Sequence, residues 1–248
     1  MSQPAIEVAD VSKRFRIYRD KPTSLKQRVL SSRSRAEDFW ALRDVALDVG
    51  EGSTFGLIGH NGSGKTTLLK CVAGILRPTS GTIRQRGRLA ALLELGAGFH
   101  PELTGRENVY LNASFLGLSR RQTDAAFDAI VAFAELEDFI DNEVKFYSSG
   151  MLVRLGFAVA VHVQPDVLLI DEVLAVGDES FQRRCLQRMD ELRAKGQTIV
   201  FVSHVLSDVR RLCERVIYLE RGTIRADGPT DEVIDLYLQD VADRQASA

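Results

Sequence analysis

The sequence predicts an α/β fold in which helices cover a largely parallel, buried sheet. Three short apolar runs, at residues 167–170, 198–202 and 216–219, are separated by charged amphipathic segments. Buried parallel strands with covering helices have this pattern. A further strand-type run at 54–58 leads into a glycine-rich loop and then into a helix opening. The order strand, glycine-rich loop, helix is typical of a phosphate-binding α/β protein.

The glycine-rich loop fits the pattern G-x-x-x-x-G-K-[ST]. Its glycines let the backbone curl so that successive N–H groups point into one hollow, where the following helix adds its positive dipole end. We expect Lys65 to reach the outer phosphates of a nucleotide and Thr66 to ligate the accompanying magnesium. The alternative, a turn with an incidental lysine, is disfavoured by the correct flanks. The predicted phosphate-binding residues are Gly59, His60, Asn61, Gly62, Ser63, Gly64, Lys65, Thr66 and Thr67.

Two alternating segments before the loop predict an antiparallel edge. Residues 6–11 and 41–49 alternate as half-buried strands do, and a Gly-Glu-Gly turn closes the second segment. Between them, residues 19–39 are rich in Lys, Arg and Ser and indicate an inserted basic helix and loop. Two interpretations of the insertion stay open: a solvated surface excursion, or an element that docks on a partner or a membrane surface.

A helical subdomain is predicted from about residue 95 to about residue 165. Turn and strand signals at 77–93 end the β-rich part, and helical spacing follows at 108–116 and 123–133. Thr123 offers an N-cap to the second of these helices.

Length and composition predict one folded domain over residues 1–248. The chain is 45% hydrophobic, and its 32 basic and 34 acidic residues give a formal net charge of −2. A net charge this small gives the chain no overall electrostatic attraction to nucleic acid or lipid. Cys71, Cys185 and Cys213 lack C-x-x-C spacing, which argues against a zinc site or a disulfide framework. Without a signal-type segment or 18 uninterrupted apolar residues, the sequence predicts a cytosolic chain.

Polar residues follow two of the apolar runs, at the sheet edge where open α/β proteins bind ligands. We expect Asp171 to hold magnesium or its water shell and Glu172 to orient or deprotonate an attacking water. His204 follows the next strand, and its imidazole can hydrogen-bond a γ-phosphate and that water. Alone, such residues are more often turn or cap residues; the phosphate loop favours the functional interpretation.

A second anion site is predicted ahead of the apolar run at 152–163. Ser148 can cap a helix there and donate its hydroxyl to a phosphate, while Ser149 and Gly150 leave room for backbone N–H groups to approach. As an isolated pattern this would be only a capping motif.

In this order the elements resemble the nucleotide-binding subunit of ABC transporters over essentially the whole chain. The phosphate loop resembles the family's Walker A loop, residues 147–151 (Tyr-Ser-Ser-Gly-Met) its L-S-G-G-Q signature, and residues 167–172 its Walker B motif. Asp178 stands at the D-loop position and His204 at that of the switch histidine. The resemblance implies a P-loop NTPase fold with a mixed sheet core, an N-terminal antiparallel part and an inserted helical subdomain. It also implies a homodimer that sandwiches two ATP molecules and Mg²⁺, each Walker A loop facing the other subunit's signature.

Two positions depart from the family's pattern. The glutamine-loop residue is absent, and Glu94 is the nearest polar candidate for its role at the metal. The adenine-stacking aromatic is expected in the first strand, where Phe15 fits best and Tyr18 is the rival.

Three features are similar to those of ATPases that export polysaccharides: the variant signature, residues 93–108 and the basic insertion. This resemblance implies export of a lipid-linked polysaccharide (O-antigen, capsule or teichoic acid) through a separate membrane permease, from the cytoplasmic side of the bacterial inner membrane. The alternatives are another ABC transporter type such as an importer, a soluble ABC-type ATPase acting on nucleic acid or ribosomes, and a non-hydrolysing regulatory module. Some O-antigen members carry a C-terminal carbohydrate-binding domain, which is either lacking or removed beyond Ala248.

Overall fold

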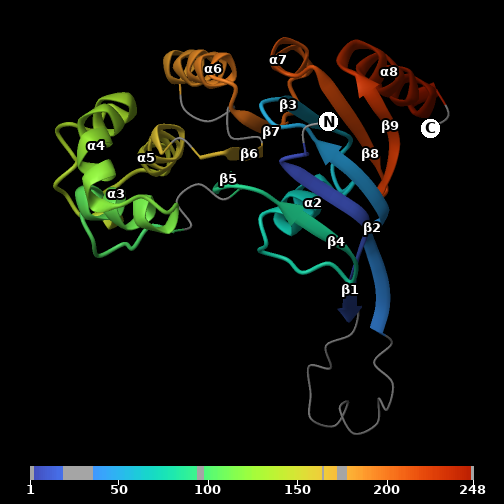
Figure 1. Ribbon diagram of the computed structural model, residues 1–248, viewed down its shortest axis with the longest axis horizontal. Helices are drawn as coiled ribbons and strands as arrows, with labels where there is room; N and C mark the ends of the chain where they lie inside the picture. The colour runs from blue at the N-terminus through green and yellow to red at the C-terminus, as the bar shows by residue number, and fades with distance from the viewer. Residues whose placement is uncertain (1–2, 19–35, 94–97, 164, 172–177, 247–248) are drawn as a thin grey trace, which may run out of the picture.

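The computed structural model describes residues 3–18, 36–93, 98–163, 165–171 and 178–246. Its strands form a six-stranded sheet of order β5-β6-β7-β3-β8-β9 and a three-stranded sheet of order β2-β1-β4 (Figure 1). The strands are β1 (Ile6–Tyr18), β2 (Ala36–Val49), β3 (Thr54–Ile58), β4 (Ser80–Gln85), β5 (Leu89–Leu92), β6 (Val167–Asp171), β7 (Thr198–Val202), β8 (Arg215–Glu220) and β9 (Thr223–Pro229). The helices are α2 (Lys65–Val72), α3 (Gly105–Phe115), α4 (Arg120–Ala134), the short 3-10 helix η1 (Val144–Phe146), α5 (Ser149–His162), α6 (Glu179–Ala194), α7 (Leu206–Leu212) and α8 (Thr230–Ala246).

The six-stranded sheet is mixed, as predicted. β5, β6, β7, β3 and β8 pair in parallel, and β9 pairs antiparallel with β8. β3 and β7 are buried along their whole length. Continuous apolar runs suit these strands because helices or a second sheet cover both of their faces.

Neighbouring residues of one strand enter two different cores. Ile58 packs with residues of α5, α6, α7 and α8, whereas Leu57 packs with α2 and the three-stranded sheet. This alternation places α6, α7 and α8 on one face of the large sheet and α2 on the other, between the two sheets (Figure 1). The predicted α/β fold is confirmed.

The three-stranded sheet corrects one predicted boundary. Residues 36–39, expected to end the basic insertion, belong to β2 and pair with the end of β1 in the register Ile17↔Glu37 and Phe15↔Phe39. The side chains of Arg14 and Asp38 form an ion pair of 2.8 Å across the same two strands. Cross-strand pairs such as Phe15 with Phe39, and the diagonal ion pair of Arg14 with Asp38, extend the ladder toward the insertion. The remainder of the insertion, 19–35, lies outside the described residues.

The helices α3, α4 and α5 form a separate small core around Val109, Ile130 and Leu155. They lie together beside the sheets (Figure 1). The predicted N-cap of α4 was wrong: Ser119 caps the helix in a capping box with Gln122, and Thr123 is a buried residue inside it. A Ser-x-x-Gln box satisfies two free N–H groups at once, which a cap at Thr123 would not do. No described helix is long and apolar enough to cross a bilayer.

Candidate functional site

The phosphate loop curls between β3 and α2 through three glycines with positive φ. These angles are 148° at Gly59, 79° at Gly62 and 110° at Gly64. A Cβ would stand 2.3 Å from the carbonyl oxygen of Leu219 at Gly59, and 2.6 Å from that of Ala41 at Gly64. Glycine is therefore required at both ends of the loop, by conformation and by space.

The start of α2 is open to an anion. Gly64 is the N-cap, no side chain caps the helix, and its first turn contains no acidic residue. The hydroxyl of Ser63 is fully buried and has no hydrogen-bond partner among the described residues. Uncapped N–H groups beside an unsatisfied buried hydroxyl fit a phosphate-bearing ligand.

Lys65 lies across the loop that it follows. Its side chain is buried, and Nζ donates hydrogen bonds to the carbonyl oxygens of Gly59 at 2.8 Å and His60 at 3.1 Å. The ammonium group is thus held at the hollow of the loop, where it can contact the phosphates of a bound nucleotide.

Thr66 and Asp171 are brought into contact from residues 105 positions apart. The Thr66 hydroxyl donates to Oδ2 of Asp171 at 3.0 Å. Among the described residues, no group of three or more His, Cys, Asp or Glu side chains can hold a metal ion. A Mg²⁺ ion at this pair would therefore complete its shell with oxygens of the substrate phosphates and with water, as Mg²⁺ ordinarily does.

The predicted hydrolytic residues follow adjacent strands. Asp171 of β6 is paired with Val202 of β7, which ends two residues before His204, and β7 in turn pairs with β3. His204 is exposed in the turn before α7, where Ser203 Oγ accepts a hydrogen bond of 3.0 Å from the N–H of Val205. The carboxyl ends of β6, β7 and β3 therefore meet at one edge of the sheet. Glu172 and Glu94 lie outside the described residues.

A cavity of about 360 Å³ adjoins the loop, and one aromatic ring from the described part of the chain lines it. That ring is Phe39, which is 48% exposed, whereas the predicted Phe15 is its cross-strand partner and has Lys13 Nζ 5.2 Å from its ring centroid. Sequence reasoning missed Phe39 because it was assigned to the insertion. Residues 37–41 (Glu-Asp-Phe-Trp-Ala) do not alternate, so only the register of β2 against β1 places Phe39. Of Tyr18, the structure describes only the backbone, at the end of β1. The His60 ring nitrogen Nδ1 lies 2.8 Å from the carbonyl oxygen of Asn61. The cavity is lined by Phe39, Ala41, Asn61, Gly62, Gly64, Lys65, Thr66 and Thr67.

The signature stands at the start of α5. Ser148 is the N-cap, and its Oγ accepts a hydrogen bond of 3.2 Å from the N–H of Met151. Ser149 and Gly150 form the first turn, which contains no acidic residue, and a Cβ at Gly150 would meet only Ser148 Oγ at 3.8 Å. This second helix start is also suited to an anion.

The two helix starts are not brought together within the chain. None of the described residues 148–150 lines the cavity beside the phosphate loop. Figure 1 shows α5 with α3 and α4, apart from α2. Within the described residues, the two helix starts are therefore separate features.

Asp178 ties α5 to the start of α6. Its Oδ1 accepts a hydrogen bond of 2.8 Å from the N–H of Phe181, and its Oδ2 pairs with the guanidinium of Arg154. The backbone hydrogen bond and the charge of Arg154 hold the pKa of Asp178 below its usual range. Arg154 also contacts Glu135 of the α4 C-cap at 2.7 Å. No motif signal could have indicated Arg154, because its role depends on the packing of three helices.

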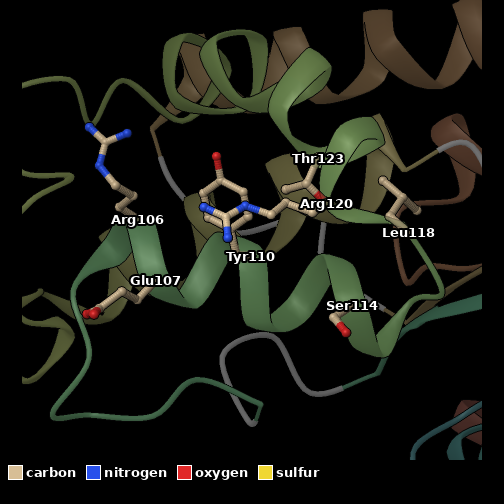
Figure 2. A pocket seen from close by; sticks show the side chains of 7 residues that line it. All are labelled: Arg106, Glu107, Tyr110, Ser114, Leu118, Arg120 and Thr123. Carbon is tan, nitrogen blue, oxygen red and sulfur yellow. The ribbon is translucent and has the colours of Figure 1, made fainter.

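A second cavity, of about 460 Å³, lies between α3 and α4 and is shown in Figure 2. Its guanidinium and aromatic groups already contact each other or nearby residues. Arg106 lies 4.6 Å from the centroid of the Phe127 ring, which stacks on Tyr110 at 5.7 Å. The Tyr110 hydroxyl donates to Asp124 at 2.7 Å. These contacts hold the two helices together and offer no catalytic set, so the phosphate loop remains the candidate site.

Comparisons with known proteins agree with this site. The family model described as ABC transporter matches residues 42–175. An O-antigen export system ATP-binding protein, RfbB of Klebsiella pneumoniae, is 45% identical, and the match covers 97% of this chain and 100% of the relative. A teichoic acids export ATP-binding protein, TagH of Levilactobacillus brevis, is 44% identical over 94% of this chain and 64% of the relative. A solved ATP-binding subunit of an ABC transporter has a TM-score of 0.75 at 26% identity, covering 92% of this chain and 91% of that one.

The family model covers more than half of the 248 residues, and relatives above 40% identity extend along nearly the whole chain. The chain therefore belongs to the ABC transporter family, as an ATPase subunit.

Proposed function

We propose that the chain hydrolyses MgATP to power export of a lipid-linked polysaccharide, of the O-antigen class, through a separate membrane permease. The observation that carries the proposal is the open start of α2 beside the 3.0 Å contact of Thr66 with Asp171. The cargo class rests on the relatives, which are named as O-antigen and teichoic acids export proteins. Teichoic acid is accordingly the alternative cargo.

The phosphate loop binds and orients the substrate. Backbone N–H groups at the start of α2 donate to the β- and γ-phosphates, and Lys65 balances their charge from the hollow of the loop. Oxygens of Thr66 and Asp171 hold the Mg²⁺ that belongs to the substrate. Phe39 offers its exposed face to the base, with Phe15 beside it on the neighbouring strand.

Hydrolysis requires a positioned water. Glu172 follows Asp171 in the chain, and we assign it to orient the water and accept its proton as the water oxygen attacks the γ-phosphorus in line. The bond from that phosphorus to the bridging oxygen breaks, so ADP and phosphate leave. His204 donates a hydrogen bond to the γ-phosphate and stabilises the charge that spreads over its oxygens.

The second helix start completes the site from another copy. Residues 148–150 face outwards on α5, and the structure leaves space at Gly150 for a phosphate to approach. In a homodimer with two-fold symmetry, each signature faces the partner's phosphate loop, and Asp178 lies near the same junction. The dimer is held at the cytoplasmic face of the bacterial inner membrane by the permease.

Phosphate release by the purified chain tests the enzymatic part. Glu172→Gln is expected to bind MgATP and to lose turnover, whereas Lys65→Ala is expected to lose binding itself. Unchanged hydrolysis in Glu172→Gln would contradict the assignment of the base, and retained affinity in Lys65→Ala would contradict that of the phosphate loop.

A cellular assay tests the cargo independently. A strain that lacks the chain is expected to lose its surface polysaccharide, and the wild-type chain but not Glu172→Gln should restore it. Normal surface polysaccharide in the deletion strain would overturn the cargo class without affecting the ATPase assignment.

A further inference from the structure

The segment before α3 and the segment before the signature are hydrogen-bonded along their length. We refer to residues 101–106 and 140–147 together as the seam. An antiparallel bridge joins Thr104 to Glu143 at its centre. Four backbone hydrogen bonds, including the two that form this bridge, join the segments: Val144 N to Leu103 O (2.9 Å), Gly105 N to Asn142 O (3.0 Å), Arg106 N to Ile140 O (2.8 Å) and Lys145 N to Pro101 O (3.0 Å).

Charged side chains hold both ends of the seam. Arg106 pairs with Asp141 at 2.7 Å, and Lys145 pairs with Glu102 at 3.0 Å. The hydrogen bond that Arg106 donates to Asp141 raises the pKa of Arg106 and lowers that of Asp141. Hydrogen bonds to Glu143 and then Glu102 raise the pKa of Lys145. The two segments are therefore joined as one unit over the pH range in which the acidic and the basic side chain of each ion pair are charged.

The α3 side of the seam is anchored. Thr104 and Glu107 form a capping box at the start of α3. Asn108 is completely buried; its side-chain amide donates to the carbonyl oxygens of His100, Leu103 and Thr104, and its oxygen accepts from the N–H of His100 at 2.7 Å. A buried amide with this many partners fixes the backbone around it.

Tyr147 fits into a space left by Gly105, the first residue of α3. Its side chain is buried, and its hydroxyl donates to the carbonyl oxygen of Phe139 at 2.7 Å. A Cβ at Gly105 would stand 2.1 Å from the Tyr147 hydroxyl and 3.0 Å from the carbonyl oxygen of Ile140. Gly105 has no positive φ, so space and not backbone conformation requires glycine there.

Tyr147 also immediately precedes the helix start assigned to the partner's nucleotide. Its neighbour Ser148 is the N-cap of α5. We propose that Tyr147 is a positioning residue: its side chain, with the hydroxyl against Gly105, sets where residues 148–150 stand relative to the start of α3. The residue acts through the signature and does not touch the nucleotide, and this role rests on the proposed function. A smaller side chain at this position would leave the space at Gly105 unfilled and the Phe139 carbonyl without its donor.

Steady-state hydrolysis by the full chain tests the pair of residues. Gly105→Ala is expected to lower kcat by about tenfold to a hundredfold because the new Cβ displaces Tyr147 and with it the signature. ATP affinity at the phosphate loop should be unchanged. In Gly105→Ala/Tyr147→Leu the smaller side chain removes the 2.1 Å clash and leaves only the 3.0 Å approach to the Ile140 carbonyl oxygen, so kcat should return close to that of Tyr147→Leu alone.

Amide hydrogen exchange without nucleotide gives a readout that does not depend on ATPase activity. Gly105→Ala is expected to speed exchange at residues 151 and 152, whose N–H groups are hydrogen-bonded to Ser148, by about tenfold, because displacing Tyr147 loosens the first turn of α5. The double variant should exchange like Tyr147→Leu alone. Gly228→Ala, where the nearest atom to the new Cβ is 3.8 Å away, is the matched control and should change neither kcat nor exchange.

The outcomes separate the two proposals. If the wild-type chain does not hydrolyse ATP, the proposed function fails, while the exchange data still decide the role of Tyr147. Wild-type kcat and exchange in Gly105→Ala would overturn that role. A loss in the double variant that equals the sum of the two single losses would overturn it as well, because the two positions would then act independently.

Discussion

The chain has two helix starts suited to phosphate, and it builds them differently. At α2 the N-cap is Gly64, with φ of 110° and no side-chain cap. At α5 the N-cap is Ser148, whose hydroxyl accepts from the N–H of Met151. The first gains its shape from glycine conformations inside one loop, whereas the second is placed by the seam, which joins it to residues more than 30 positions earlier.

This difference relates to what each start must do. The α2 loop takes its shape from glycine conformations and from the close approach of Leu219 and Ala41. The α5 start is instead positioned by the packing of α3, α4 and α5. In the proposed function, α2 accordingly holds the nucleotide and α5 of a second copy completes the site.

Alanine at the two glycines should give the largest contrast. Gly64→Ala is expected to weaken MgATP binding by on the order of a hundredfold, because it strains a positive φ and clashes with the Ala41 carbonyl. Gly150→Ala should bind MgATP like the wild type, since its Cβ has space and its φ is not positive. Titration calorimetry in a Glu172→Gln background measures both affinities, and comparable losses would remove the distinction.

The contact of Thr66 with Asp171 predicts a magnesium-specific effect at α2. Thr66→Val keeps the shape of the side chain and removes its oxygen, so affinity for MgATP should fall by about tenfold. Affinity for ATP in the presence of a magnesium chelator should not change. Thr66→Ser retains the hydroxyl and serves as the control; an equal loss with and without magnesium would argue that Thr66 acts in packing only.

These tests concern residues that a local motif could reveal and residues that it could not. The phosphate loop and Asp171 were predictable because a spacing of residues in one segment implies their chemistry. Phe39 depends on the register of β2 against β1, and Arg154 on the packing of α4, α5 and α6. The fit of Tyr147 to Gly105 joins two loops far apart in sequence, and no periodicity in either loop indicates it. Fold class followed from apolar runs, while the start of β2 and the cap of α4 required the structure.

The N-cap of α5 predicts a smaller effect, on stability. Ser148→Ala removes the acceptor for the N–H of Met151 and should lower the free energy of unfolding by about 1 kcal/mol. Ser148→Asp retains an acceptor and should preserve stability while repelling a phosphate in the assembled site. Urea unfolding checks both variants. No equivalent substitution exists at α2, which has no side-chain cap. A loss of stability in Ser148→Ala would therefore show that the two helix starts are held differently.

The last turns of the two helices predict the smallest effect, a dependence on pH. The last turn of α2 has Lys70, and that of α5 has His162. Burial lowers the pKa of His162 below its ordinary 6.5, and the charge of nearby Arg188 lowers it further. The hydrogen bond to the Ala158 carbonyl oxygen and the charge of Glu191 act in the opposite direction. The neutral form is thus favoured in the folded chain, and its contribution to stability is present above pH 6.5 and is lost as the pH falls toward the lowered pKa.

Unfolding of wild type and His162→Gln at several pH values checks that prediction. The wild type should lose more stability than His162→Gln as the pH falls from neutral toward 5. Parallel pH profiles for the two proteins would show that His162 does not titrate with folding.

Mixing two inactive variants tests directly whether α2 and α5 of different copies form one site. Lys65→Ala disables the phosphate loop, and Gly150→Asp places a negative charge at the start of α5. Each variant alone should be inactive, but a mixed dimer has one site in which an intact loop faces an intact signature. An equal mixture should therefore recover about a quarter of wild-type hydrolysis, since half of the dimers are mixed and each has one intact site of two. Activity that stays at the level of the separate variants would show that the two helix starts do not complete one another across copies.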